Sequence, residues 1–310
     1  MKVKVVSIVG PTAVGKTDIS IEIAKRFNAE IISGDSMQVY KDLNIGTAKI
    51  TEEEMQGIPH HMIDMLNPDE NFTVADFKDH VHYFIDQIHK KDKLPIIVGG
   101  SGHYIQSVLF DYQFLENSRD EQYRRHLEQI IDTKGINQVY ENLIEIDPDQ
   151  ARKIHPNNHR RVIRALEIYK TTGKTMSEHI KEQRKDPLYN MKIIGLDMDR
   201  KLLYERINKR VDLMIEAGLI AEVKELYKKG LKDCQSMTGI GYKEFIPYFE
   251  GTVSLEAAIE TLKRNTRRYA KRQFTFFRNR LPVDWYKITN TNRKEQYQKI
   301  IENLAGFLKD

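Results

Sequence analysis

The chain has 310 residues, 40% of them hydrophobic and 30% charged, with a net charge of +4, which is typical of a globular protein of about two domains. Its single cysteine, Cys234, excludes an intramolecular disulfide and a cysteine-rich zinc site and is typical of a reducing compartment. No apolar run approaches the roughly 20 residues that cross a bilayer, and the first residues are too quickly interrupted for a signal peptide. We therefore expect a cytoplasmic protein with no membrane partner.

Strands and helices alternate along most of the chain. Apolar runs predict strands at 3–9, 29–33, 93–100, 190–199 and 283–288, and helical periodicity predicts helices over 17–27 and 73–91. This alternation predicts an α/β fold, a parallel sheet flanked by helices, with ligands at the carboxyl ends of the strands.

A segment of different composition and periodicity interrupts this alternation. Residues 118–188 are polar and helical in pattern, without a convincing strand, and we interpret them as an inserted helical domain. The core is then discontinuous, with residues 1–117 and 189–310. Within its second part, residues 201–230 predict two amphipathic helices, broken near Gly218 and ended at Gly230.

The string GPTAVGKT follows the first strand and precedes the first helix. A G-x-x-x-x-G-K-T pattern in that place is the ATP-binding-type motif of nucleotide-binding proteins, because its backbone N–H groups can surround phosphates at a helix N-terminus. Lys16 is expected to reach the terminal phosphates, and the Thr17 hydroxyl to be a ligand of Mg²⁺. The expected phosphate-binding residues are Gly10, Pro11, Thr12, Ala13, Val14, Gly15, Lys16 and Thr17.

An acidic residue, Asp35, lies just beyond the strand at 29–33. P-loop hydrolases have an apolar strand that ends in a metal-holding Asp, whereas here the best apolar strand ends in glycines and a serine. A carboxylate at the end of a neighbouring strand could support a metal or accept a proton. Position alone leaves both roles open, beside that of a solvated loop residue.

Two basic segments distinguish the rest of the chain. Residues 118–310 carry a net charge of +10, against −6 for residues 1–117. Residues 263–280 hold eight basic residues, four aromatics and no acid, and a helix would gather Arg264, Arg268 and Arg272 on one side. A second cluster lies at 155–175. Two separated basic surfaces favour a long nucleic acid. The pair His60 and His61 has no further ligand at suitable spacing, which favours a packing role over a metal site.

Together these strings resemble one family, the tRNA dimethylallyltransferases, in their bacterial form. The matching strings, in chain order, are GPTAVGKT, DSMQVY with IGTAK, PHHMID, IIVGGSGHYI, HPNNHRRVIRALE, DRKLLYERINKRVDLMIEAGLIAEV, TGIGYKE and RRYAKRQFTFFR. The resemblance implies a P-loop kinase-like core with an inserted helical domain. It also implies transfer of a dimethylallyl group from dimethylallyl diphosphate to the exocyclic amine of the adenosine just 3′ of the tRNA anticodon. A small-molecule kinase and a non-catalytic RNA-binding P-loop protein are the alternatives.

The resemblance also assigns roles to residues. Arg210, in the string RINKR, would bind the diphosphate with Lys16 and a Thr17-bound Mg²⁺, and Asp35 would accept the proton of the amine. The residues implied to contact the tRNA anticodon stem-loop are Asp35, Ser36, Met37, Gln38, Ser101, Arg124, Arg160, Arg161, Arg164, Arg268, Arg272 and Gln273. Ser101 stands where the family more often has Thr, and Phe276 where Trp is common. We expect a monomer.

Overall fold

The computed structural model describes residues 2–112, 120–183 and 186–309, which fall into two compact units. The larger unit is Met1–Asp111 with Pro187–Asp310, and the smaller is Tyr112–Asp186. The boundary predicted after residue 117 lies outside the described residues. At the other boundary, residues 187 and 188 belong to the larger unit, where the N–H of Leu188 donates to the carbonyl of Leu109.

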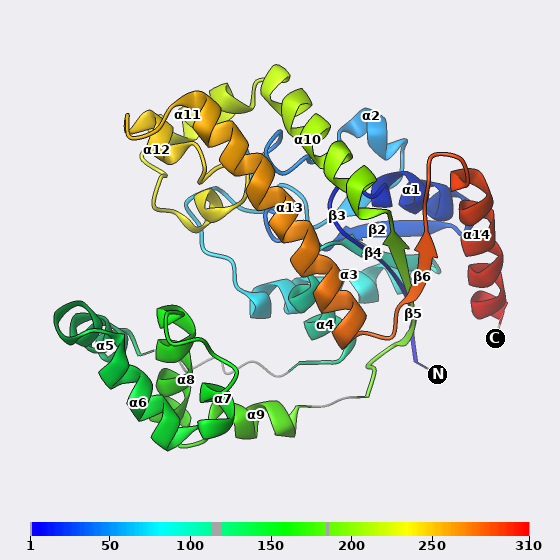
Figure 1. Ribbon diagram of the computed structural model, residues 1–310. Helices are drawn as coiled ribbons and strands as arrows, with labels where there is room; N and C mark the ends of the chain where they lie inside the picture. The colour runs from blue at the N-terminus through cyan, green and yellow to red at the C-terminus, as the bar shows by residue number, and fades with distance from the viewer. Residues whose placement is uncertain (1, 113–119, 184–185, 310) are drawn as a thin grey trace. The chain divides into compact units, whose positions relative to one another are not determined.

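A six-stranded sheet forms the centre of the larger unit, in the order β3-β2-β4-β1-β5-β6 (Figure 1). Every neighbouring pair is parallel. The strands are β1 Lys4–Val9, β2 Ala29–Ser33, β3 His60–His61, β4 Leu94–Gly99, β5 Asn190–Asp197 and β6 Asp284–Lys287. The predicted α/β fold is confirmed, except that β3 was missed because two residues give no periodic signal.

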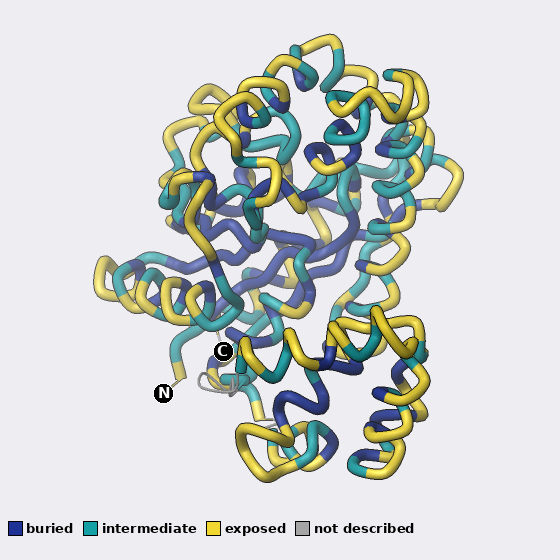
Figure 2. The backbone as a smooth tube through the Cα atoms, turned by 90° about the vertical axis from the view of Figure 1, so that its left-hand side faces the viewer, coloured by how far each residue is buried: buried dark blue, intermediate teal, exposed yellow. Residues whose placement is uncertain are grey.

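Helices cover both faces of the sheet. Successive residues of a strand point to opposite faces, so Val5 and Val9 of β1 enter one apolar core while Val6 and Ile8 enter the other. The first core is shared with α3 and α4, and the second with α1 and α14. Figure 2 shows the resulting buried strands between more exposed helices.

Recognisable caps mark the ends of some helices of the larger unit. Thr73 and Asp76 form a capping box before α3, and Gly218, with φ +102°, separates α10 from α11 as predicted. The helices are α1 Lys16–Arg26, α2 Glu52–Met55, α3 Val74–His89, α4 Gly102–Leu109, α10 Arg200–Glu216, α11 Leu219–Lys228, α12 Ile246–Phe249, α13 Leu255–Arg280 and α14 Arg293–Lys309, with a 3₁₀ turn at Gln235–Thr238. Among the described residues, no helix is both long and apolar enough to cross a membrane.

The smaller unit has its own apolar core, built by Leu127, Val139, Leu143, Val162 and Leu166. Its described residues form helices and no strand, in agreement with the expected helical insertion. These helices are α5 Glu121–Lys134, α6 Ile136–Ile146, α7 Pro148–Ala151, α8 His159–Thr172 and α9 Met176–Glu182.

Candidate active site

A cavity of about 390 Å³ opens at the carboxyl ends of β2 and β4, beside the loop that follows β1. Parallel sheets place their ligands at this edge. The cavity brings together residues from far apart in the sequence. Those predicted from the sequence that line it are Thr12, Lys16, Thr17, Asp35, Ser36, Met37, Gln38, Arg210, Arg272 and Gln273.

The phosphate loop, residues 10–17, has backbone conformations that favour glycine. Gly10 has φ +148°, and a Cβ there would lie 2.8 Å from the carbonyl oxygen of Leu196. Gly15, with φ +103°, is the N-cap of α1. The first amides of a helix have no acceptor within the helix, so they can bind an anion. The Lys16 ammonium donates to the carbonyls of Gly10 (3.0 Å) and Pro11 (2.8 Å), at the mouth of this loop.

Two side chains from distant helices hold the phosphate loop in place. Gln273 of α13 accepts from the N–H of Thr12 (3.0 Å) and donates to the carbonyl of Gly100 (3.1 Å), so it joins the loop to the end of β4. Tyr297 of α14 donates to the carbonyl of Gly15 (3.1 Å). Gln273 is only 5% exposed, and its amide groups are used within the protein. Its predicted contact with tRNA stays a prediction.

Three charged groups face one another in the cavity. Burial raises the pKa of Asp35, although Lys16 and Arg210 oppose this, and its carboxylate accepts from the N–H of Met37 (2.9 Å). Burial, with a contribution from Arg210, lowers the pKa of Lys16 to about 7. Burial also lowers the pKa of Arg210, with Asp35 opposing. A carboxylate thus lies beside two cations, as a site that binds an anion and moves a proton requires.

Gln38 of the same loop is oriented by the protein. Its carbonyl oxygen accepts from the hydroxyl of Ser33 (2.9 Å), and its NH₂ group donates to the carbonyls of Thr47 (3.3 Å) and Ala48 (3.4 Å). The Ser33 hydroxyl also accepts from the N–H of Asp35 (3.4 Å). Gln38 therefore links the end of β2 to the loop around residue 47.

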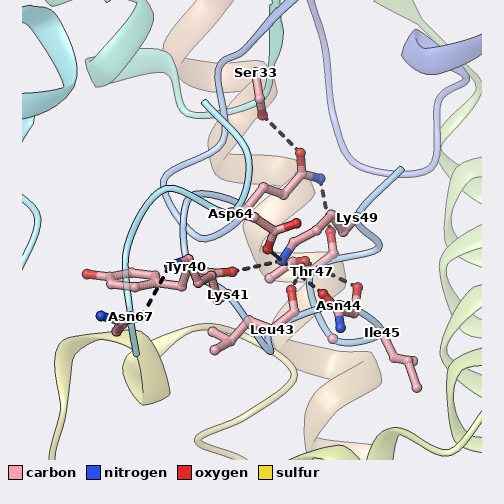
Figure 3. A network of polar contacts seen from close by, with 12 residues as sticks. Ser33, Tyr40, Lys41, Leu43, Asn44, Ile45, Thr47, Lys49, Asp64 and Asn67 are labelled. Carbon is pink, nitrogen blue, oxygen red and sulfur yellow. Dashed lines mark hydrogen bonds and ion pairs between the residues drawn. The ribbon is translucent and has the colours of Figure 1, made fainter. Parts of the chain in front are cut away.

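Lys49, to which no role was assigned from the sequence, stabilises the loop of residues 34–49 (Figure 3). Its ammonium donates to the carbonyl of Tyr40 (2.7 Å) and the amide oxygen of Asn44 (2.9 Å), and it forms an ion pair with Asp64. The Lys49 side chain is only 6% exposed. The string IGTAK, which contains it, was the only signal.

Tyr269 of α13 also escaped the sequence analysis. It lines the cavity, and burial together with the nearby Asp35 raises the pKa of its phenol to about 12. Ser101, the predicted RNA contact at the start of α4, lies close to this phenol and counteracts part of the shift. The phenol therefore stays protonated and can donate.

The basic segment 263–280 lies within α13 and is more compensated than its letters indicated. The expectation that no acid balances it was wrong for Lys263, which pairs with Asp212 (2.7 Å), and for Arg278, which pairs with Asp197 (2.8 Å). These acids come from α10 and β5. The residues lining a second, open cavity of about 560 Å³ are Arg268, Lys271, Arg272, Thr275, Phe276, Asn279 and Arg280.

The predicted arginines of the smaller unit divide into two pairs. Arg124 and Arg164 bind the same carboxylate oxygen of Glu167, at 2.9 and 2.8 Å. Glu167 is fully buried; burial alone would raise its pKa, but the hydrogen bonds from Arg164 and Arg124 lower it. Arg160 and Arg161 are exposed. The first pair thus has a structural partner that the sequence analysis did not identify.

The two adjacent histidines diverge. His61 contacts Glu30 at 2.7 Å, and the ring of His60 contacts the carbonyl of Ile58 at 2.8 Å and borders the cavity. In the described part of the chain, no group of three or more His, Cys, Asp or Glu residues could hold a metal ion.

A sequence model of the family "IPP transferase" matches residues 38–280. The chain belongs to this family. It is 56% identical to a tRNA dimethylallyltransferase of Oceanobacillus iheyensis over 100% of this chain and 99% of that one. It is 55% identical to that of Bacillus subtilis, over 99% and 98%. The resemblance drawn from the motifs is therefore confirmed.

Solved structures agree with this membership. The tRNA isopentenylpyrophosphate transferase of Bacillus halodurans has a TM-score of 0.76 and 51% identity, covering 99% of this chain and 97% of that one. A eukaryotic dimethylallyltransferase acting on tRNA has a TM-score of 0.84 and 34% identity, covering 99% and 80%. The bacterial enzyme and the eukaryotic enzyme thus share the fold of this chain.

Proposed function

We propose that this IPP transferase family enzyme moves the dimethylallyl group of dimethylallyl diphosphate to the exocyclic amine of the adenosine immediately 3′ of the tRNA anticodon. The observation that carries the proposal is the cavity in which a phosphate loop, two cations and a carboxylate meet. A kinase would not need the basic residues of α13, and a binding protein would not need Asp35.

The donor half of the reaction belongs to the phosphate loop. The loop amides, Lys16 and Arg210 bind the diphosphate, and they stabilise the charge that grows on it as the carbon–oxygen bond breaks. The electron pair of that bond leaves with the diphosphate. The allylic carbon forms its new bond to the adenine nitrogen. No phosphoryl group is transferred.

The acceptor half belongs to Asp35. An aromatic amine is a poor nucleophile and too weak an acid to ionise in advance, so a base must take its proton as the carbon–nitrogen bond forms. The raised pKa of Asp35 makes its carboxylate a better base than an exposed one. The adenine that receives the dimethylallyl group first has to leave the stack of bases in the anticodon loop to reach the cavity.

The donor set of the cavity fits a Mg²⁺ ion brought with the substrate. Mg²⁺ in phosphate sites takes most of its ligands from water and substrate phosphates, and the Ser or Thr hydroxyl that ends a P-loop motif can supply one more. Thr17 lines the cavity in the first turn of α1 and is the residue that would hold it. When bound, Mg²⁺ supplies further charge stabilisation to the leaving diphosphate.

The remaining assignments concern tRNA and the state of the enzyme. We place the tRNA backbone against the exposed Arg268 and Arg272 of α13 and Arg160 and Arg161 of α8, because phosphate contacts need unpaired cations. We also propose that the enzyme acts as a monomer. A cytoplasmic enzyme fits the single cysteine.

One experiment tests the reaction. The protein is incubated with labelled dimethylallyl diphosphate, Mg²⁺ and unmodified tRNA, and label is sought at the adenosine 3′ of the anticodon. We expect transfer with release of one diphosphate for each group transferred. Absence of transfer, together with ATP-dependent phosphorylation of a small acceptor, would establish the kinase alternative instead.

A second experiment tests the tRNA surface. Changing Arg160 and Arg161 together to Ala should weaken tRNA binding and make the slope of log K against log salt shallower by roughly 1 to 2. Arg164→Ala should instead lower Tm, because it leaves the buried Glu167 with one cation fewer. An unchanged salt slope in the double variant would remove α8 from the interface.

A further inference from the structure

Glu222 of α11 gathers four donors on one carboxylate. Its Oε2 accepts from the backbone N–H groups of Asn44 (3.1 Å) and Ile45 (2.8 Å), and its Oε1 from that of Gly46 (3.1 Å). Its Oε1 also accepts from the hydroxyl of Tyr242 (2.7 Å). Three consecutive amides directed at one anion fix the course of the backbone there.

The same backbone is enclosed from the other side by the turn at 239–244. The ring of Tyr242 is fully buried, and a Cβ at Gly46 would lie 2.5 Å from it. Gly241, with φ +106°, also passes close to this backbone, since a Cβ there would lie 3.0 Å from the carbonyl oxygen of Gly46. Glu244 ties this turn to α13 by accepting from the N–H of Gly241 (2.9 Å) and from Asn265 (2.8 Å). The segment 44–46 therefore has little freedom to move.

The residues that follow this segment lead to the acceptor side of the cavity. Thr47 and Ala48 present their carbonyls to the NH₂ group of Gln38, and the other end of Gln38 accepts from Ser33. The hydroxyl of Ser33 in turn accepts from the N–H of Asp35. Figure 3 shows Ser33, Asn44, Ile45 and Thr47 along this path. None of these four hydrogen bonds of Glu222 involves a residue of the phosphate loop.

We propose that Glu222 is a positioning residue for the acceptor half of the reaction: through segment 44–48 and Gln38 it sets where Asp35 stands relative to the incoming base. The inference rests on the proposed function, because it assumes that Asp35 takes the proton of the amine. Glu222 should affect the acceptor half of the cavity and not the donor half, because Gln273 and Tyr297 hold the phosphate loop.

The test uses the full-length enzyme with Glu222→Gln, which keeps the side-chain volume but turns an NH₂ group toward backbone donors. We expect kcat to fall roughly 10- to 100-fold, as for a reacting group displaced by about 1 Å. Equilibrium binding of dimethylallyl diphosphate should stay within twofold. The matched control is Glu225→Gln on the same helix, whose side chain is 65% exposed and bonds Lys228; it should leave every parameter unchanged.

A second variant keeps the inference testable if Glu222→Gln does not fold. Tyr242→Phe removes one donor to the same carboxylate with almost no change of volume, and kcat should fall several-fold while donor binding is kept. A folded Glu222→Gln with wild-type kcat overturns the inference. So does a parallel fall of kcat, donor affinity and Tm, which marks a general structural role. If the wild-type enzyme transfers nothing, the proposed function fails, and not this inference alone.

Discussion

The phosphate loop at 10–17 and the loop at 34–49 border the same cavity but are held in different ways. The phosphate loop takes its shape from glycine conformations and the start of α1, with one side chain each from α13 and α14 added. The loop at 34–49 is irregular, and side chains that are distant from it in the sequence or lie at its end hold it: its own Lys49, Glu222 of α11 and Tyr242. The conformation of a loop that depends on its own glycines can be predicted from its local sequence. The conformation of a loop that depends on distant side chains cannot.

The largest effect should come from the loop at 34–49, called the acceptor loop below because it carries Asp35. Asp35→Asn preserves shape but removes the proposed proton acceptor, so kcat should fall about 10²- to 10⁴-fold, the range for a lost general base. Binding of dimethylallyl diphosphate, measured at equilibrium, should survive within a few-fold. Asp42→Asn is the control, because Asp42 lies in the same loop, is 57% exposed and pairs with Lys229. Turnover within a few-fold of wild type would remove Asp35 from the chemistry.

Gly46→Ala tests whether packing against Tyr242 governs the acceptor loop. The added Cβ meets the buried ring at 2.5 Å, and overpacking of this kind costs about 1–3 kcal/mol of folding stability. Tm and kcat should both fall, and donor binding should change less than kcat. Gly306→Ala in α14, where a Cβ meets nothing within 4 Å, is the control. A fall confined to donor binding would reverse the comparison between the loops.

The phosphate loop should show its own pH dependence. Lys16 has a pKa lowered to about 7, and in the proposed reaction its protonated form attracts the diphosphate. As pH rises through about 7 the free enzyme loses this charge, so kcat/KM for dimethylallyl diphosphate should fall, approaching tenfold per pH unit. Lys16→Arg should flatten this limb, because a guanidinium stays charged. If kcat/KM of that variant still falls with rising pH as in the wild-type enzyme, a group other than Lys16 causes the fall.

The smallest effect should come from the helix that supports the phosphate loop. Tyr297→Phe removes the hydrogen bond to Gly15, a loss of about 1 kcal/mol, so KM for dimethylallyl diphosphate should rise only a few-fold. KM for tRNA should not change. Tyr286→Phe, which removes a hydroxyl bonded by Asn303 of the same helix, should leave both values alone. A larger rise in KM for tRNA than for the donor would mean that the two loops are not held independently.

The sequence predicted what local patterns encode. All strands except β3, the glycine-rich turn between β1 and α1, and the break at Gly218 were predicted, because spacing and glycine positions are visible in a short window. Position alone placed Asp35 at a strand end next to the phosphate loop, whereas Arg210 of α10 was assigned to the same site only through the resemblance.

The misses have a common physical cause, which is pairing over long sequence distances. The tRNA contact implied for Gln273 stays a prediction, but its hydrogen bonds to the backbone of Thr12 and Gly100 were not predicted. Glu222 looked like one more charge on an amphipathic helix. Only the pairing of Arg164 with Glu167 had a local signal, the i,i+3 spacing that favours contact on a helix.

The place of β1 in the sheet has a consequence for the order of synthesis. β1 pairs with β4 and with β5, and β5 follows the whole helical insertion in the chain. On the ribosome, the insertion, with its own core, is complete before β1 gains its second neighbour. The phosphate loop waits longer still, because Tyr297 comes from the last helix. In a nascent chain, the smaller unit, which carries the exposed Arg160 and Arg161, is therefore complete before the site that we propose for dimethylallyl diphosphate.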